Sequence, residues 1–137
     1  MKENKLVELS MGFSVDIINL VKFLKSNHET IIANQIGRSG TSVGANIREA
    51  KYAHGTADFV SKMQIALKEA NETGYLLELL YKTNYIGEEQ YNFLEAKCIK
   101  CDAGVHLNKF HLFSLQPISK SYDLFISHFS KFFNILP

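Results

Sequence analysis

Two helical stripes that meet at a glycine, which lie mostly within residues 42–80, constrain the fold of this chain more than any other feature. Before the glycine, small and apolar residues recur every three or four positions, at Ile32, Ile36, Ser39, Val43, Asn46, Ala50 and Ala53. Past Gly55, the same spacing returns at Phe59, Met63, Ala66, Ala70, Thr73, Leu77 and Leu80. This spacing places each set on one face of an α-helix. The stretch predicts two helices that pack against each other through these stripes, with an asparagine, Asn46, inside one of them.

Four helical segments follow from this periodicity. The first is expected at about 6–27 and the second at about 30–54, where Gly55 ends it. Thr56 is expected to cap the third helix, with Asp58 at the positive end of its dipole. Residues 84–87 break the pattern, and a fourth helix restarts at about Glu88. Since the connections are short, the predicted fold class is all-α, an antiparallel up-and-down four-helix bundle over residues 1–110.

The composition changes after Asp102, because only one acid, Asp123, remains and six of the ten phenylalanines lie between Phe110 and Phe133. Residues 111–137 are therefore predicted to be an aromatic-rich C-terminal extension, not a separate domain, with a short helix from about Ser119. Packing on the bundle or another subunit, disorder, and binding at a membrane surface remain open for it. A lineage-specific extension and a shifted reading frame would both produce such a change.

Charge and targeting features narrow the function classes. The chain carries 15 lysines and arginines against 14 acids, a net charge of +1, which gives no global attraction to nucleic acid or anionic membrane. The N-terminus lacks the apolar core of a signal peptide, and no apolar run approaches the roughly 20 residues of a membrane span. We expect a cytoplasmic protein without a membrane partner.

A polar seam is predicted between the second and third helices. Because an unpaired buried amide costs about 1–3 kcal/mol, Asn46 should meet a group on the facing helix, and Glu69 and Glu72 are the candidates. The seam is expected to fix helix register and oligomer geometry. Its predicted members are Asn46, Glu49, Lys62, Glu69 and Glu72.

Enzyme hypotheses draw less support from the residues. Glu49, Glu69 and Glu72 could form a carboxylate site for metal or acid-base chemistry, but no histidine stands three residues after any of them, as helical di-metal sites require. Cys98 and Cys101 fall in the middle of a predicted amphipathic helix, which favours buried core thiols over a redox or zinc site. No catalytic residue, metal or cofactor is predicted. The small residues Ser39, Gly40, Ser42, Gly44 and Ala45 are expected to let helices approach closely.

One phased set of residues resembles a known family. The set comprises Gln35, Ile36, Arg38, Ser39, Ser42, Ala45, Asn46, Ile47, Glu49 and Ala50, followed by Phe59, Lys62, Ile65, Ala66, Lys68, Glu69, Glu72, Thr73, Leu76 and Leu80. It is similar to the 23S rRNA-intervening-sequence family of four-helix-bundle proteins. The resemblance implies a ring-like homo-oligomer, typically a pentamer, in the bacterial cytoplasm. A related branch, the accessory variability proteins of diversity-generating retroelements, binds nucleic acid and partners a reverse transcriptase.

The leading functional hypothesis is therefore a non-enzymatic accessory protein that binds structured RNA or an RNA-associated protein. Candidate nucleic-acid contacts are dispersed, so only a ring that repeats them would gather many phosphate contacts. These candidates are Arg38, Arg48, Lys51, Lys68, Lys97 and Lys100. A protein-interaction scaffold without nucleic-acid binding is the alternative, and a thiol or metal enzyme is the alternative from another class.

Overall fold

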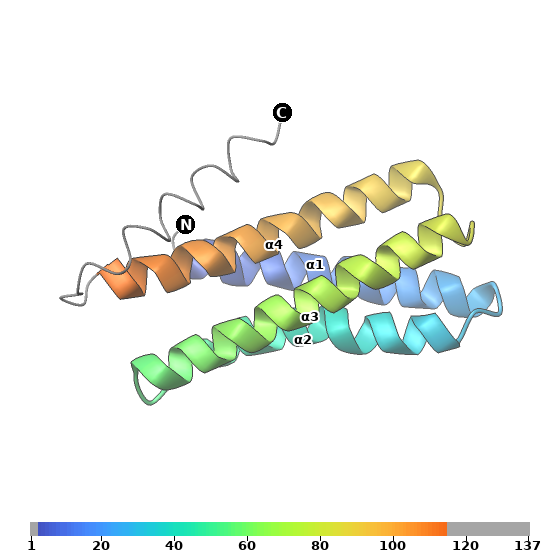
Figure 1. Ribbon diagram of the computed structural model, residues 1–137. Helices are drawn as coiled ribbons and strands as arrows, with labels where there is room; N and C mark the ends of the chain where they lie inside the picture. Colours follow the sequence, from blue (N-terminus) through green and yellow to red (C-terminus); the bar gives the residue numbers. More distant parts are fainter. Residues whose placement is uncertain (1–2, 115–137) are drawn as a thin grey trace.

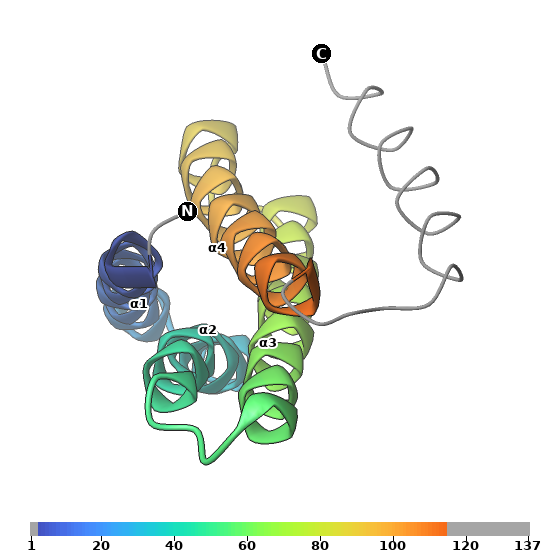
Figure 2. The same ribbon diagram turned by 90° about the vertical axis from the view of Figure 1, so that its left-hand side faces the viewer.

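The computed structural model describes residues 3–114 of the 137-residue chain, and all regular structure in that range is helical (Figure 1). The four helices are α1 (Glu3–Ser26), α2 (Ile31–Ala50), α3 (Thr56–Lys82) and α4 (Glu88–Ser114). Each packs against the next in chain order, and α4 returns to pack on α1 (Figure 2). The antiparallel four-helix bundle predicted from the sequence is confirmed.

The core contains the stripes that the periodicity predicts. Phe13, Ile17 and Leu24 of α1 are fully buried, as are Ile36 of α2 and Leu77 of α3. From α4 the core receives Leu94, Cys98, Cys101 and Val105. The predicted stripes are less regular at their ends, since Ile32, Ala53 and Phe59 are only half-buried. Burial is thus continuous in the middle of each helix and weaker near the turns.

Close packing of α1 on α2 depends on two glycines. A Cβ atom at Gly40 would lie 2.8 Å from Cγ1 of Ile17, and one at Gly44 would lie 3.0 Å from Oγ of Ser14. The predicted role of small residues in close helix approach is confirmed at these positions. It is wrong for Ala45, whose side chain is exposed and not packed between helices.

The turn between α1 and α2 places a carboxylate at the start of α2. Both oxygens of the buried Glu29 accept hydrogen bonds from backbone N–H groups, 2.9 Å to Ile32 and 2.8 Å to Ala33. His28 adopts a positive φ of 62°, which reverses the chain before this cap. A negative charge at this end of a helix is favoured by the helix dipole.

Two predicted helix ends need correction. α2 ends at Ala50 instead of His54, because the backbone N–H groups of Lys51 and Tyr52 bond three residues back and tighten the last turn. Thr56 belongs to α3 and does not cap it with its side chain. The Asp58 carboxylate closes the turn, since it accepts a hydrogen bond of 3.1 Å from the backbone N–H of His54.

Helix α4 continues past the composition change at Asp102 and ends at Ser114. Cys101, just before Asp102, and Val105, just after it, are both fully buried. Core packing therefore stabilises the helix where the amphipathic pattern fades. The helix therefore crosses the boundary predicted at residue 110. Most of the predicted aromatic extension, including the short helix from Ser119, lies outside the described residues.

None of the four helices in residues 3–114 combines the length with the hydropathy that a bilayer span requires.

Candidate functional site

The interior of the α2/α3 interface holds a pair of buried hydroxyls. Oγ1 of Thr73 on α3 lies 2.9 Å from Oγ of Ser39 on α2 and 2.8 Å from the carbonyl oxygen of Glu69 in its own helix. Both side chains are fully buried. A hydrogen bond between facing helices is lost if either helix slides, so this pair favours one register.

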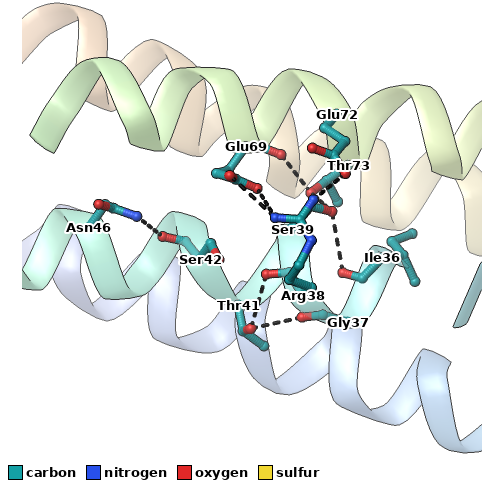
Figure 3. Close-up of polar contacts among 10 residues, drawn as sticks. All are labelled: Ile36, Gly37, Arg38, Ser39, Thr41, Ser42, Asn46, Glu69, Glu72 and Thr73. Atoms are coloured by element: carbon teal, nitrogen blue, oxygen red, sulfur yellow. Dashed lines mark hydrogen bonds and ion pairs between the residues drawn. The ribbon is translucent and has the colours of Figure 1, made fainter. Parts of the chain in front are cut away.

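An ion cluster covers the outer side of this hydroxyl pair. The Arg38 guanidinium on α2 lies between two carboxylates of α3, 3.2 Å from Glu69 and in direct contact with Glu72 (Figure 3). The hydrogen bond to Glu72, followed by the charge of Glu69, raises the pKa of Arg38. Glu69 is largely buried while Arg38 is exposed. The cluster therefore shields a carboxylate that the fold removes from water.

A second ion pair joins the same two helices nearer the α2/α3 turn. Nζ of Lys62 lies 2.7 Å from a carboxylate oxygen of Glu49. This hydrogen bond is the main reason that the pKa of Lys62 is raised. We call the hydroxyl pair and these two ion contacts the α2/α3 polar seam: Arg38, Ser39, Glu49, Lys62, Glu69, Glu72 and Thr73.

The predicted partner of Asn46 is wrong. Its Nδ2 donates a hydrogen bond of 2.9 Å to the carbonyl oxygen of Ser42, one turn earlier in α2, while Glu69 and Glu72 bind Arg38 (Figure 3). Asn46 is half-buried, so its amide finds a partner within its own helix without reaching across. The cation that the seam needs was present in the sequence as Arg38, which the dispersed-charge argument assigned to nucleic acid.

The carboxylates of the seam each face a cation. Glu49 contacts Lys62, and Glu69 and Glu72 contact Arg38, so the three acids do not converge on a common point. Within residues 3–114 no group of three or more His, Cys, Asp or Glu side chains has a geometry that could hold a metal ion. These ion pairs can stabilise the packing of α2 on α3. Because each carboxylate binds a cation, the seam does not gather several carboxylates around one point where a metal ion could bind.

Both cysteines lie in the core, as the sequence predicts. The Cys98 thiol donates to the carbonyl oxygen of Ala70 at 3.2 Å. Burial raises the pKa of Cys98 to about 12 and that of Cys101 to about 11. Since the thiolate is the reactive form, neither side chain is poised for redox or nucleophilic chemistry at neutral pH.

The predicted nucleic-acid contacts separate into two groups. Arg38 belongs to the seam, and Lys97 pairs with Asp16 of α1 while its Nζ lies 4.6 Å from the centre of the Phe93 ring. The remaining four are exposed on different parts of the bundle: Arg48 on α2, Lys51 just after it, Lys68 on α3 and Lys100 on α4. The ion pairs reduce the charge that is open to a phosphate.

Two shallow grooves run along the outside of the bundle, and the sequence interpretation missed both. The α1/α2 groove encloses about 500 Å³ and is lined by Val7, Ser10, Met11, Ser14, Thr41, Gly44, Ala45, Arg48, Glu49 and Tyr52. The α3/α4 groove encloses about 400 Å³ and is lined by Ala70, Asn71, Gly74, Tyr75, Glu78, Glu95, Cys98, Ile99 and Asp102. A signal next to the first was available, because Met11, which lines it, begins a second apolar stripe on α1 with Val15 and Ile18.

A sequence profile described as 23S rRNA-intervening sequence protein matches residues 2–106. The chain belongs to this family. The resemblance inferred from the α2 and α3 residues is thereby confirmed.

A solved member of the family has the same fold. It is the crystal structure, at 1.70 Å, of a protein with unknown function from the S23 ribosomal protein family of Bacteroides thetaiotaomicron VPI-5482. The two chains are 47% identical and superpose with a TM-score of 0.78, over 80% of this chain and 98% of that one. No curated protein matches the chain. Membership of the 23S rRNA-intervening sequence protein family therefore comes with a fold and without an assigned activity.

Proposed function

We propose that this family member is a non-enzymatic, cytoplasmic scaffold that assembles with copies of itself, as a ring that is typically a pentamer. One observation carries the proposal. The outward face of α1, opposite its core stripe, presents Met11, Val15 and Ile18, which are 46%, 52% and 42% exposed. A contiguous apolar patch on a protein surface marks an interaction site.

The polar groups of the bundle support binding over catalysis. The seam carboxylates are neutralised by Arg38 and Lys62, and burial keeps the two thiols protonated. Catalytic groups, in contrast, are poised to exchange protons or attack substrate at working pH. Within residues 3–114, the outward face of α1 leaves Met11, Val15 and Ile18 exposed, and these side chains can bind a surface but cannot exchange a proton.

The test is the mass of the purified full-length protein in sedimentation velocity across micromolar concentrations. We expect a species at a multiple of the 15.5 kDa chain mass. Val15→Glu should shift the protein toward single chains, because it places a charge in the apolar stripe. Tyr85→Glu is the matched control, since Tyr85 is also exposed but lies between α3 and α4. A wild-type protein that remains a single chain at every concentration contradicts the proposal.

Association with structured RNA, or with an RNA-associated protein, is the second candidate function. It is favoured by Arg48, whose side chain makes no hydrogen bond or ion pair within residues 3–114, and by the exposed Lys51 beside it. A ring would repeat these cations around its axis. The name of the family, which refers to 23S rRNA, agrees with this choice of ligand.

Binding of the assembled protein to a 23S rRNA fragment across a salt series tests this second candidate. Affinity should fall linearly on a log–log plot, with a slope that counts released counterions. Arg48→Gln should flatten that slope. Arg38→Gln is the matched control, because Arg38 is already bound to two carboxylates. Absence of binding at low salt would eliminate RNA and leave the scaffold.

A further inference from the structure

We propose that residues 118–136, which lie outside the described part of the chain, form a fifth helix that folds back on α4 and covers its outer side. α4 and this helix make an antiparallel pair joined by the short segment 115–117. The contact is made within one chain, so it does not depend on the self-association proposed above. The occupant is a segment of this protein, and the surface is the side of α4 opposite the core.

That side of α4 is apolar, like the side that packs in the core. α4 lies against α1 and α3 and turns one side away from the bundle (Figure 2). Four residues, spaced by three or four positions, make up this outward face of α4: Ala96, Ile99, Ala103 and Leu107. Within residues 3–114, Ile99 is 56% exposed and Leu107 is 51% exposed. Since a helix that is apolar on opposite sides is typically buried, a further element should cover this face.

The C-terminal segment contains an apolar stripe of the same length. Its members recur every three or four positions, as residues on one face of a helix do: Ile118, Tyr122, Phe125, Phe129, Phe133 and Leu136. Lys120 and Lys131 fall on the opposite side of that helix, where water can solvate them. As a helix, residues 118–136 span about 28 Å, the same length as residues 96–114 of α4. The segment is therefore long enough to cover the whole outward face of α4.

The two stripes are in register when the chain reverses at Gln116. Antiparallel helices with a short connection bring together residues that are equally distant from the middle of that connection. In the sequence, Ala103 and Phe129 are equally distant from Gln116, and so are Ile99 and Phe133. The other two pairs that follow this rule are Leu107 with Phe125 and Ala96 with Leu136. Each residue of the outward face of α4 therefore meets an apolar residue of the segment.

The sizes of the paired residues also suit close packing. Small residues of α4 stand opposite large ones in the segment, Ala103 opposite Phe129 and Ala96 opposite Leu136. Packed helices place the side chains of one helix into the gaps between side chains of the other. The alanines leave such gaps, because Ile99 and Leu107 extend on either side of Ala103. Alternation of small and large residues thus lets the added helix approach α4 closely.

The connection has the sequence of a chain reversal. α4 ends at Ser114, and Pro117 follows three residues later. Proline has no backbone N–H and disfavours a helical conformation in the residue before it, so α4 cannot continue unbroken through this point. Proline is accepted in the first turn of a new helix. Residues 115–117 match the length of 2–5 residues that is usual between two antiparallel helices.

The segment extends beyond what the chain shares with its family. The family profile ends at residue 106, and 80% of this chain matches 98% of the solved relative. The fifth helix is therefore a feature of this chain and not of the family bundle. It covers α4 and leaves the exposed stripe of Met11, Val15 and Ile18 on α1 open to a second copy.

Engineered disulfides test the register. In the Cys98→Ala/Cys101→Ala background, Ala103→Cys with Phe129→Cys places two thiols opposite each other. Ala103→Cys with Lys131→Cys is the matched control, because Lys131 is two residues away and on the other side of the helix. Under mild oxidation of dilute protein, we expect the first pair to form a disulfide within one chain at least about tenfold faster than the second. Non-reducing electrophoresis separates the 15.5 kDa chain from cross-linked chains.

Hydroxyl-radical footprinting of Ile99 tests the contact without engineered cysteines. Ile31 of α2 is the reference, since it is the same residue type and is 70% exposed. In dilute wild-type protein, Ile99 should react about fivefold more slowly than Ile31, because a packed helix excludes water. Phe129→Glu/Phe133→Glu should restore Ile99 to within about twofold of Ile31, since a carboxylate is not buried against an apolar face. Lys120→Glu/Lys131→Glu is the matched control and should keep the wild-type protection.

Three results would overturn the fifth helix. A disulfide between residues 103 and 129 that forms only between chains would place the segment on another copy. Equal rates for the two cysteine pairs would remove the register. Equal reactivity of Ile99 and Ile31 in wild-type protein would mean that the segment leaves α4 uncovered, as it would if it bound a membrane surface. Self-association through α1 is a separate matter, because its failure appears as a single-chain mass of the wild-type protein.

Discussion

The α2/α3 polar seam and the two outer grooves contain similar types of polar residue. In the seam these residues bind each other, whereas at the grooves several of them face outward. In the seam, Arg38 and Lys62 each meet a carboxylate on the facing helix, and Ser39 meets Thr73. At the grooves, Arg48 and the exposed tyrosines have no such partner on the neighbouring helix within residues 3–114. Polar groups that are satisfied within the chain specify its register, whereas those left outward are available for a second molecule.

The largest change in the unfolding free energy is expected where two helices touch. A comparison of Gly40, in such a contact, with Gly74, in an open groove, makes the difference measurable. Gly40→Ala should destabilise the fold by about 1–3 kcal/mol, because the added methyl would overlap Ile17. Gly74→Ala should stabilise it by about 0.5–1 kcal/mol, since the methyl enters open space and alanine favours the helix. Urea unfolding at one fixed protein concentration measures both. Equal effects at the two positions would remove the distinction between packed interface and open groove.

A double-mutant cycle tests whether the seam hydroxyls act as a pair. Ser39→Ala and Thr73→Val should each cost about 1–2 kcal/mol, because each leaves a buried partner with one hydrogen bond fewer. The double variant should cost less than the sum by about 0.5 kcal/mol or more. Additive costs from urea unfolding would show that the two hydroxyls do not support each other.

The two thiols report whether the α3/α4 groove is closed toward the core. Cys98 lines that groove and is nevertheless buried. Its folded pKa of about 12 lies above the ordinary value of 9.0, so its contribution to stability is complete below pH 9 and is lost as the pH rises toward 12. Between pH 9 and 10 the loss should be about 1 kcal/mol per thiol.

The measurement is unfolding free energy against pH, with Cys98→Ala/Cys101→Ala as the control that should lack this part of the decline. Native protein at pH 8 should also react with a thiol reagent far more slowly than unfolded protein. Fast reaction of one thiol in the native protein would mean that the groove opens to the core.

The smallest effect is expected at Asn46. Its place in the α2 stripe predicts a cross-helix role, yet its side-chain amide donates a hydrogen bond to the carbonyl oxygen of Ser42 in the same helix. Asn46→Ala should therefore change the unfolding free energy by no more than about 0.5 kcal/mol. A loss well above 1 kcal/mol in thermal or urea unfolding would place Asn46 back in the seam.

The fold was predictable from the sequence because its information is periodic. The spacing of Phe13, Ile17 and Leu24 determines a buried face, and the glycine break at Gly55 correctly separates two long helices. Helix ends were less predictable, since the end of α2 depends on backbone bonds near Tyr52 and on the Asp58 carboxylate. Those contacts are set by the geometry of the turn and have no periodic signature.

The polar seam was predictable only in part, because which cation binds which carboxylate depends on how far each side chain extends between the packed helices. Glu49 and Lys62 were assigned to the seam and do contact each other, whereas Arg38 was assigned to nucleic acid although it spans the gap to Glu69 and Glu72. The grooves escaped notice because each is lined by residues of two helices, and which residues meet there depends on how the two helices pack. An apolar stripe on the solvent side, such as that of Met11, is the pattern that could have revealed one of them.

The most direct test of the central claim is hydroxyl-radical footprinting of Met11 and Tyr85 in the wild-type protein at low and high protein concentration. In an isolated chain both side chains should react, because Met11 is 46% exposed and Tyr85 is 43% exposed. Self-association through the outward face of α1 predicts that Met11 becomes protected as the protein assembles, while Tyr85 keeps its reactivity. Unchanged reactivity of Met11 in protein shown to be assembled would contradict the account.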